Sequence, residues 1–233
     1  MKFLYISFFM IFFASCSKKN VKVPVNNNPG IHEIWDNSPV YILMKVENND
    51  TLADLKIGHV MSTTHWLVAA DKRLRIKKMT KAIQKILDKK HKKSIHSKEG
   101  THAYFSYLDS VQKKISFIDF DSIQIVPNFY RSTSYMKEYS KADENYQKYH
   151  LSILPHRVIF GNSINFDNRV SKYQVYDSIW KIVGTQTDNR SNILYLNFDE
   201  NITFNRFLDY YTFFKHNPIP KGKLSQKIFI FKP

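Results

Sequence analysis

The apolar and polar positions in the first half of the chain predict a unit of strands and one helix. Apolar residues recur at intervals of three and four from Ile76 to Leu87, which places them on one face of a helix. A polar stretch at residues 47–51 separates two strongly apolar runs, and Asp71 stands at the end of the second run. The predicted strands are residues 40–46, 65–70, 104–107 and 115–125, so we assign residues 31–126 to a first α+β unit.

The second half of the chain continues this alternation after a polar, tyrosine-rich stretch. Residues 127–151 predict a connector that can hold a helix over 134–149. Gly161 and Asn162 are typical of a hairpin turn, Gly184 is placed to end a helix, and Thr203 is a residue type that caps helices. The elements predicted for the second unit, residues 152–233, are a hairpin at 157–166, helices at 172–183 and from 203, and strands at 192–198 and 227–231.

The two units share an apolar pattern when Asp71 is placed on Asp199. The strand before each aspartate and the helix after it then coincide, although almost no residue is identical. The sequence therefore predicts an α+β fold of two small sheet-plus-helix units. A degenerate internal repeat explains the coincidence, and so does chance similarity between two strand–helix–strand units. The aligned apolar pairs are Ile76 with Phe204, Met79 with Phe207, Ile83 with Tyr211 and Ile86 with Phe214.

The order of elements in the second unit resembles the periplasmic domain of the ExbD/TolR family. The hairpin at 158–166, the helix from Lys172, the strand ending at Asp199 and the helix from Thr203 carry this resemblance. It covers the first unit more loosely, and it implies two helices packed on one face of a small sheet. That family drives proton-linked transport through an acidic residue in a transmembrane helix. The sequence predicts no such helix here, so the resemblance implies a binding fold without the motor.

Residues 1–15 have the parts of a lipoprotein signal peptide. Lys2 supplies a positive start, residues 3–13 are almost wholly apolar, and two small residues follow. At about 1.5 Å per residue this segment makes a helix of about 20 Å, too short for a hydrocarbon core of about 30 Å. The run from Phe13 to Cys16, Phe-Ala-Ser-Cys, resembles the lipobox. We therefore expect cleavage before Cys16 and attachment of diacylglycerol, with acyl chains such as palmitate, to its sulfur.

The residues after the lipid-bearing cysteine predict a tether and a compartment. Residues 16–30 contain two prolines and three consecutive asparagines, which is typical of a flexible, lipidated tether. Cys16 is the only cysteine, so we expect no disulfide. Ser17 follows it in place of aspartate. By resemblance to known sorting rules, this favours the outer membrane, and we expect the protein on its periplasmic face.

The formal net charge of +15 narrows the class of partner. A basic excess indicates nucleic acid, anionic lipid or an acidic partner. Export makes nucleic acid improbable, which leaves the membrane, an envelope protein or an anionic envelope polymer. Lys78, Lys81, Lys85 and Lys89 form a basic stripe along the predicted helix, and they are our candidate residues for binding an anionic partner. The alternative is a solvated lysine face without a partner.

The other candidate residues favour structural roles. His91, His96 and His102 fit no single helical face and stand among lysines, so we predict no metal site and no cofactor. Alternation in a half-exposed strand accounts for Asp119 and Asp121. Asp71 and Asp199 are placed to begin a turn or a helix cap.

No catalytic motif is present, because the sequence has no nucleophile elbow, no zincin helix and no phosphate-binding glycine loop. We therefore expect a non-catalytic, lipid-anchored cell-envelope protein that binds another envelope component through its basic helix face. The alternatives are a lipid-anchored hydrolase of envelope polymers and an immunity or inhibitor lipoprotein. Polar groups converging in a deep cleft would favour the hydrolase.

Overall fold

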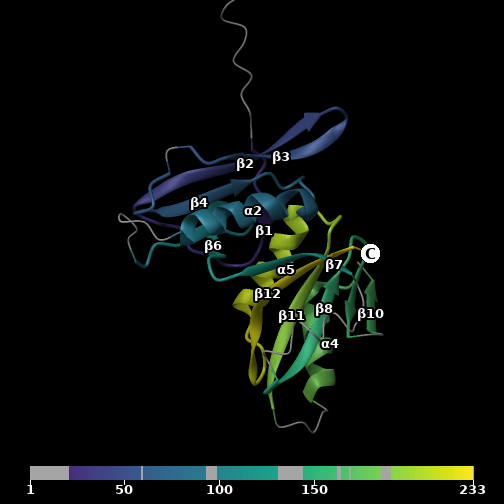
Figure 1. The fold of residues 1–233 in the computed structure, drawn as a ribbon. Helices are drawn as coiled ribbons and strands as arrows, with labels where there is room; N and C mark the ends of the chain where they lie inside the picture. The colour runs from purple at the N-terminus through teal and green to yellow at the C-terminus, as the bar shows by residue number, and fades with distance from the viewer. Residues whose placement is uncertain are drawn as a thin grey trace, which may run out of the picture.

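The structure is a computed structural model that describes residues 21–58, 60–92, 99–130, 144–161, 164–167, 169–184 and 190–232. Within these ranges the chain forms two six-stranded sheets and three helices (Figure 1). The predicted class, an α+β fold of two sheet-plus-helix units, is confirmed. One continuous apolar core runs through both units.

Unit 1 is the first sheet, with strand order β1-β5-β4-β2-β3 and β6 paired to β5, together with helix α2. Its strands alternate between buried and partly exposed residues, as in β4, where Trp66, Val68 and Ala70 are buried. Such alternation indicates a sheet with one face on the core. The elements are β1 (Val25–Asn26), β2 (Asn37–Glu47), β3 (Asp50–Lys56), β4 (His65–Ala70), α2 (Ile76–His91), β5 (Ala103–Asp109) and β6 (Lys114–Asp119).

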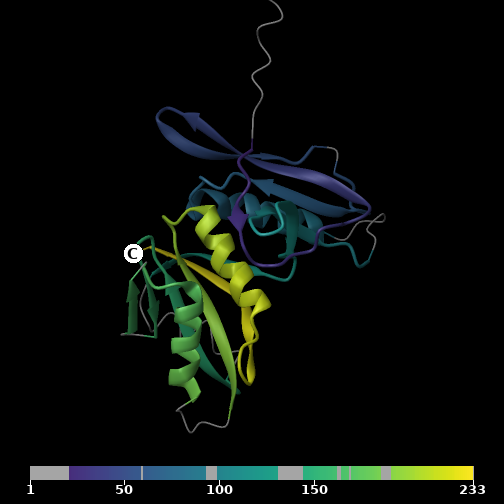
Figure 2. The same ribbon diagram turned by 180° about the vertical axis from the view of Figure 1, so that it is seen from behind.

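Unit 2 is the second sheet, with strand order β10-β9-β8-β11-β12-β7, together with helices α4 and α5. Both helices lie on one face of this sheet (Figure 2). Strand β11 runs parallel to both of its neighbours and is buried throughout after its first residue. The elements are β7 (Gln124–Tyr130), β8 (Tyr146–Ile153), β9 (Arg157–Phe160), β10 (Ile164–Asp167), α4 (Lys172–Gly184), β11 (Ser191–Asp199), α5 (Phe204–His216) and β12 (Gly222–Lys232).

The two units meet through matching segments that precede α2 and α5. Arg75 and Thr203, which stand at the starts of these helices, form an antiparallel β-bridge. The backbone hydrogen bonds around the bridge are reciprocal at the offset that places Asp71 on Asp199. They are Ile76 N to Ile202 O (2.9 Å), Phe204 N to Leu74 O (2.7 Å), Lys77 N to Glu200 O (3.0 Å) and Asn205 N to Lys72 O (3.3 Å).

Local turn chemistry explains why both segments take the same shape. The Asp71 carboxylate accepts a hydrogen bond from Arg73 N (3.0 Å), and Asp199 accepts one from Asn201 N (2.8 Å). The predicted turn role of both aspartates is therefore confirmed. The predicted cap at Thr203 is also confirmed, because its hydroxyl accepts from Arg206 N at 3.3 Å.

The predicted flexible tether over residues 16–30 is wrong for its second half. Strand β1 pairs in parallel with β5, and Asn26 and Asn28 are buried. Tyr107 Oη donates to the carbonyls of Asn28 (3.1 Å) and Pro29 (2.9 Å). A Cβ at Gly30 would lie 2.2 Å from the same hydroxyl, so the chain passes too close to unit 1 for a larger residue. The asparagines therefore satisfy hydrogen bonds inside the fold.

The predicted unit boundaries near the middle of the chain are also wrong. The strand expected over 115–125 is two strands, because β6 ends at Asp119 and β7 begins at Gln124 in the other sheet. Residues 146–149, assigned to a connector and a helix, begin β8, which pairs with β11. Strand β3, which was not predicted, is the edge strand beside β2. In helix α4, Val175, Ile179 and Val183 are buried, whereas Tyr173 is half exposed.

A partly buried histidine on β8 makes the stability of unit 2 depend on pH. His150 stacks on Tyr195, with ring centroids 4.9 Å apart. Burial lowers the pKa of His150 to about 4 from its ordinary 6.5, and the Asn197 side chain offsets this only in part. Below pH 6.5 His150 becomes protonated in the unfolded chain, whereas in the folded protein it stays neutral down to about pH 4.

We therefore expect the free energy of unfolding to fall as pH is lowered from 6.5 to about 4, by up to about 3 kcal/mol from this group. Denaturant unfolding of His150→Gln should show a smaller loss over this range. The matched control is His156→Gln, because His156 is exposed. An unchanged pH dependence in the His150 variant would contradict the assignment.

Candidate functional site

Two lysines of α2 form an exposed basic surface that no acidic group neutralises. Lys81 and Lys85 lie one turn apart, and among the described residues neither forms an ion pair. Together with Lys77 they line a hollow of about 330 Å³ between α2 and the end of unit 2 where Glu200 and Ile230 lie. Glu200 is already engaged, with its Oε1 3.7 Å from Lys77 Nζ. This arrangement can attract a phosphate or a carboxylate.

The other two candidate lysines are engaged in contacts within unit 1. Lys78 Nζ lies 2.6 Å from Asp50 Oδ2, which ties α2 to the start of β3. Lys89 Nζ stands 6.0 Å from the centre of the Trp66 ring. The predicted stripe of Lys78, Lys81, Lys85 and Lys89 is therefore divided, and Lys81 and Lys85 are the pair that the fold leaves available.

The loop before α2 contains an ion pair between a buried aspartate and an exposed arginine, close to the start of the described chain. Asp71 is 1% exposed, and its Oδ2 lies 2.7 Å from Arg73 Nη2. Burial would raise the pKa of Asp71, but hydrogen bonds from the Arg73 side chain and backbone and from the Lys22 backbone lower it overall. Lys72 N donates to the Lys22 carbonyl at 2.8 Å. Asp71 is thus the acceptor that fixes both this loop and residue 22.

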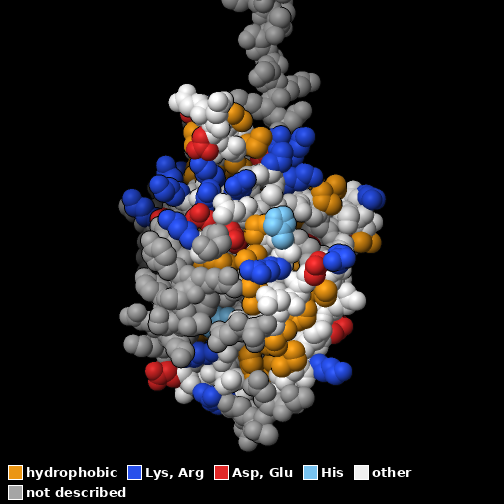
Figure 3. Space-filling model, turned by 90° about the vertical axis from the view of Figure 1, so that its right-hand side faces the viewer, with side chains coloured by type: hydrophobic (Ala, Val, Ile, Leu, Met, Phe, Trp, Pro, Cys, Tyr) orange, Lys and Arg blue, Asp and Glu red, His pale blue; other side chains and the backbone are white. Residues whose placement is uncertain are grey.

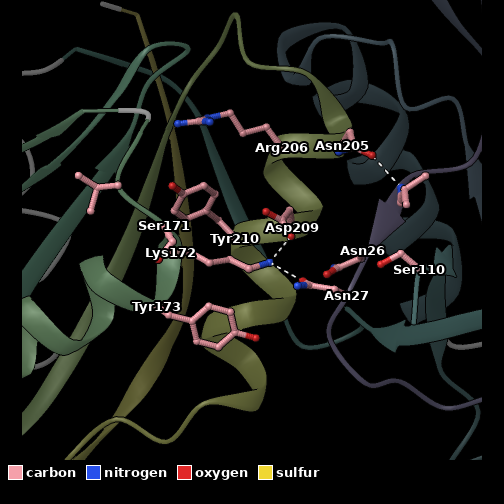
Figure 4. Close-up of a pocket in the computed structure, with 12 residues that line it drawn as sticks. Asn26, Asn27, Ser110, Ser171, Lys172, Tyr173, Asn205, Arg206, Asp209 and Tyr210 are labelled. Atoms are coloured by element: carbon pink, nitrogen blue, oxygen red, sulfur yellow. Dashed lines mark hydrogen bonds and ion pairs between the residues drawn. The ribbon is translucent and has the colours of Figure 1, made fainter. Parts of the chain in front are cut away.

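A second cavity, of about 500 Å³, lies where the N-terminal segment crosses unit 2 (Figure 4). Lys172 comes from the start of α4 and points toward Asp209 of α5 and Asn27 of the N-terminal segment. Its Nζ is paired with the Asp209 carboxylate and donates to Asn27 Oδ1 at 3.0 Å. The Lys172 side chain is only 11% exposed. The carboxylate is therefore neutralised within the fold.

Behind this cavity, asparagines of the N-terminal segment bond to α5. The Asn26 side-chain amide donates to Thr212 Oγ1, and Asn28 Nδ2 donates to the same oxygen at 3.0 Å. Val25 N donates to Asn205 Oδ1 at 2.8 Å. The segment thus contacts unit 1 through its backbone, and unit 2 through its asparagine side chains and the backbone of Val25. We call residues 24–30 the clasp.

The histidines and aspartates of the candidate metal group pair with one another at one end of unit 1. His102 Nδ1 lies 3.0 Å from Asp119 Oδ2, and His91 Nε2 lies 3.3 Å from Asp121 Oδ2. His96 lies outside the described residues. Within the part of the chain that the structure describes, no three such side chains are arranged to hold a metal ion. The His91 pair joins the end of α2 to the segment after β6. The His102 pair joins the segment before β5 to the end of β6.

The membrane attachment site lies outside the described residues, which begin at Val21, so Cys16 and the signal peptide stay predictions. None of the helices in the described ranges is long and apolar enough to cross a bilayer. No protein-family model matches the chain, and no curated protein or solved structure matches it. The function is therefore inferred from the chain's own residues.

Sequence reasoning missed the clasp and the cavity beside it. Asn26, Lys172 and Asp209 are far apart in the sequence, and three consecutive asparagines are ordinarily typical of a loop. A usable signal was present in Gly30, since glycine often marks a close backbone approach. The contact partners themselves could not be read from any local pattern.

We predict that Asp71→Asn destabilises the protein by about 1–2 kcal/mol, because the two hydrogen bonds from the Arg73 side chain lose their ionised acceptor. Hydrogen exchange at residues 22–28 should accelerate in this variant, because the loop whose Lys72 N–H binds the Lys22 carbonyl loses the ion pair with Arg73. The same ion pair should weaken only as pH falls below the ordinary Asp value of 3.8, since the folded-state pKa is lowered.

The matched control is Asp199→Asn at the equivalent position of unit 2. Asp199 has no ion pair among the described residues, and asparagine can still accept from Asn201 N. Its effect should be well below that of the Asp71 variant. Equal effects in the two variants would contradict a special role for the Arg73 pair.

Proposed function

We propose that the chain is a lipid-anchored, non-catalytic protein of the bacterial cell envelope that works by binding an anionic envelope component. The anchor is the lipid on Cys16, and Ser17 favours the periplasmic face of the outer membrane. The binding surface is the α2 face at Lys81 and Lys85.

The observation that carries this proposal is the unneutralised charge of Lys81 and Lys85. Like charges one turn apart on a helix repel, which costs a few tenths of a kcal/mol. Lys77 and Lys78 have carboxylate partners, whereas Lys81 and Lys85 have none among the described residues. Glu200 is paired with Lys77, and Asp88 in the same hollow accepts from Gln84 Nε2, so an external anion is the partner that would relieve this repulsion.

Enzymatic activity is less well supported than binding. In the cavity of about 500 Å³, the Asp209 carboxylate is paired with Lys172, so it is a weak general base. The order of elements in unit 2, with helices before and after β11, supports a binding fold like the one that the ExbD/TolR resemblance implies.

Lipid attachment is tested by mass spectrometry of the N-terminal peptide from membranes. We expect diacylglycerol on Cys16 of the cleaved chain and membrane fractionation of the protein. In Cys16→Ser the uncut precursor should accumulate, because the modified cysteine directs the cut. A wild-type cysteine without lipid would contradict the anchor.

The binding surface is tested by retention of envelope fragments on immobilised protein. The double variant Lys81→Gln/Lys85→Gln should retain less material, and the loss should resemble the effect of high salt on the wild type. The control is Lys181→Gln/Lys221→Gln, which removes the same charge from exposed positions in α4 and before β12. Equal retention by both variants would exclude the α2 face.

A further inference from the structure

Contacts at residue 22, just before the clasp, leave only a short free chain between the proposed anchor and the fold. Residue 22 is held by a hydrogen bond from Lys72 N to its carbonyl at 2.8 Å. Only five residues lie between Cys16 and Lys22, which is six steps from one Cα to the next. At about 3.3–3.6 Å per extended residue, this length reaches about 20 Å at most. A lipid on Cys16 therefore keeps Lys22 and the loop that holds it close to the bilayer surface.

The surface around this attachment point is basic. Lys22 is exposed, Lys72 and Arg75 lie on the loop that holds it, and α2 follows that loop directly. Three nearby acidic groups are already paired, Asp50 with Lys78, Asp71 with Arg73 and Glu200 with Lys77, and Asp88 accepts from Gln84 Nε2. Among the described residues no ion pair involves the remaining five, which we call the basic surface: Lys22, Lys72, Arg75, Lys81 and Lys85.

On one face of the molecule, basic side chains are unevenly distributed between the two units. Figure 3 shows Lys and Arg side chains gathered on the upper part of one face, which unit 1 occupies, with few on the lower part. On this face, the basic side chains lie over the unit that the short N-terminal chain holds nearest to its proposed anchor.

We propose that the basic surface lies against the anionic headgroups of the same membrane that carries the lipid of Cys16, and so orients unit 1 toward the bilayer. This inference depends on the proposed lipid anchor and names lipid phosphates as the anionic component. Lysine and arginine side chains bind an anionic leaflet additively, and such attraction acts within a Debye length of about 8–10 Å. The short reach of residues 16–22 limits how far the basic surface can move from the bilayer and allows it to come within that range.

The orientation has a consequence for the rest of the molecule. Helix α4 and the start of β12 lie at the end of unit 2 away from unit 1 (Figure 1). In this orientation unit 2 points away from the bilayer. In the same orientation, the cavity beside the clasp, which Lys172 and Asn205 line, lies closer to the membrane than the far end of unit 2 does.

The test is amine footprinting of the intact lipoprotein in vesicles. The purified protein is reconstituted into phosphatidylcholine vesicles with or without phosphatidylglycerol and acetylated briefly, and each lysine is read by mass spectrometry. We expect Lys22, Lys72, Lys81 and Lys85 to react several-fold more slowly in the anionic vesicles. Lys181 and Lys221 are the internal controls and should react equally in both. High salt should abolish the difference.

A matched pair of variants tests whether the surface acts as a unit. In Lys81→Gln/Lys85→Gln, the protection of Lys22 and Lys72 should decrease, whereas Lys181→Gln/Lys221→Gln should leave it unchanged. Equal reactivity of the basic surface in anionic and neutral vesicles would overturn the inference, and so would protection that persists in high salt. The mass of the Cys16 peptide is measured in the same sample. Missing lipid would defeat the proposed function as a whole, whereas lipid without protection would defeat this inference alone.

Discussion

The arrangement of the molecule depends on the reciprocal backbone pairing between the segments before α2 and α5. The bridge between Arg75 and Thr203 and the four hydrogen bonds around it satisfy N–H groups at the starts of both helices. Helix starts leave such groups without partners inside the helix. Each unit supplies backbone carbonyls that accept from the N–H groups at the helix start of the other unit. The junction therefore joins the two units and fixes where both helices begin.

The clasp connects this junction to the N-terminus. Its backbone extends the sheet of unit 1, and its asparagines bond to Thr212 of unit 2. A segment that contacts both units stabilises their relative position. It also ends close to Asp71, which anchors the loop before α2. The position of the proposed membrane anchor is therefore coupled, through a few hydrogen bonds, to the surface that carries Lys81 and Lys85.

Where prediction failed, the cause was long-range pairing. Residues 115–125 look like one strand because both halves alternate, but the turn after Asp119 sends the chain into the other sheet. Residues 146–149 look like a connector because they include polar side chains. In the structure the first three side chains of β8 are only partly buried, and polar residues are tolerated there. Whether a short segment becomes a strand depends on a neighbouring edge, and that neighbour is β11, more than forty residues away.

Sequence alone determined the features with a local physical cause. The helix period at residues 76–87, the cap at Thr203, the aspartate turns and the class of the fold follow from neighbouring residues. The offset between Asp71 and Asp199 was also visible. Only the tertiary structure decided that these segments pair, that the asparagines form a clasp, and that Lys81 and Lys85 stay free while Lys78 is paired. Those outcomes depend on which distant groups meet, and residue type does not specify a partner.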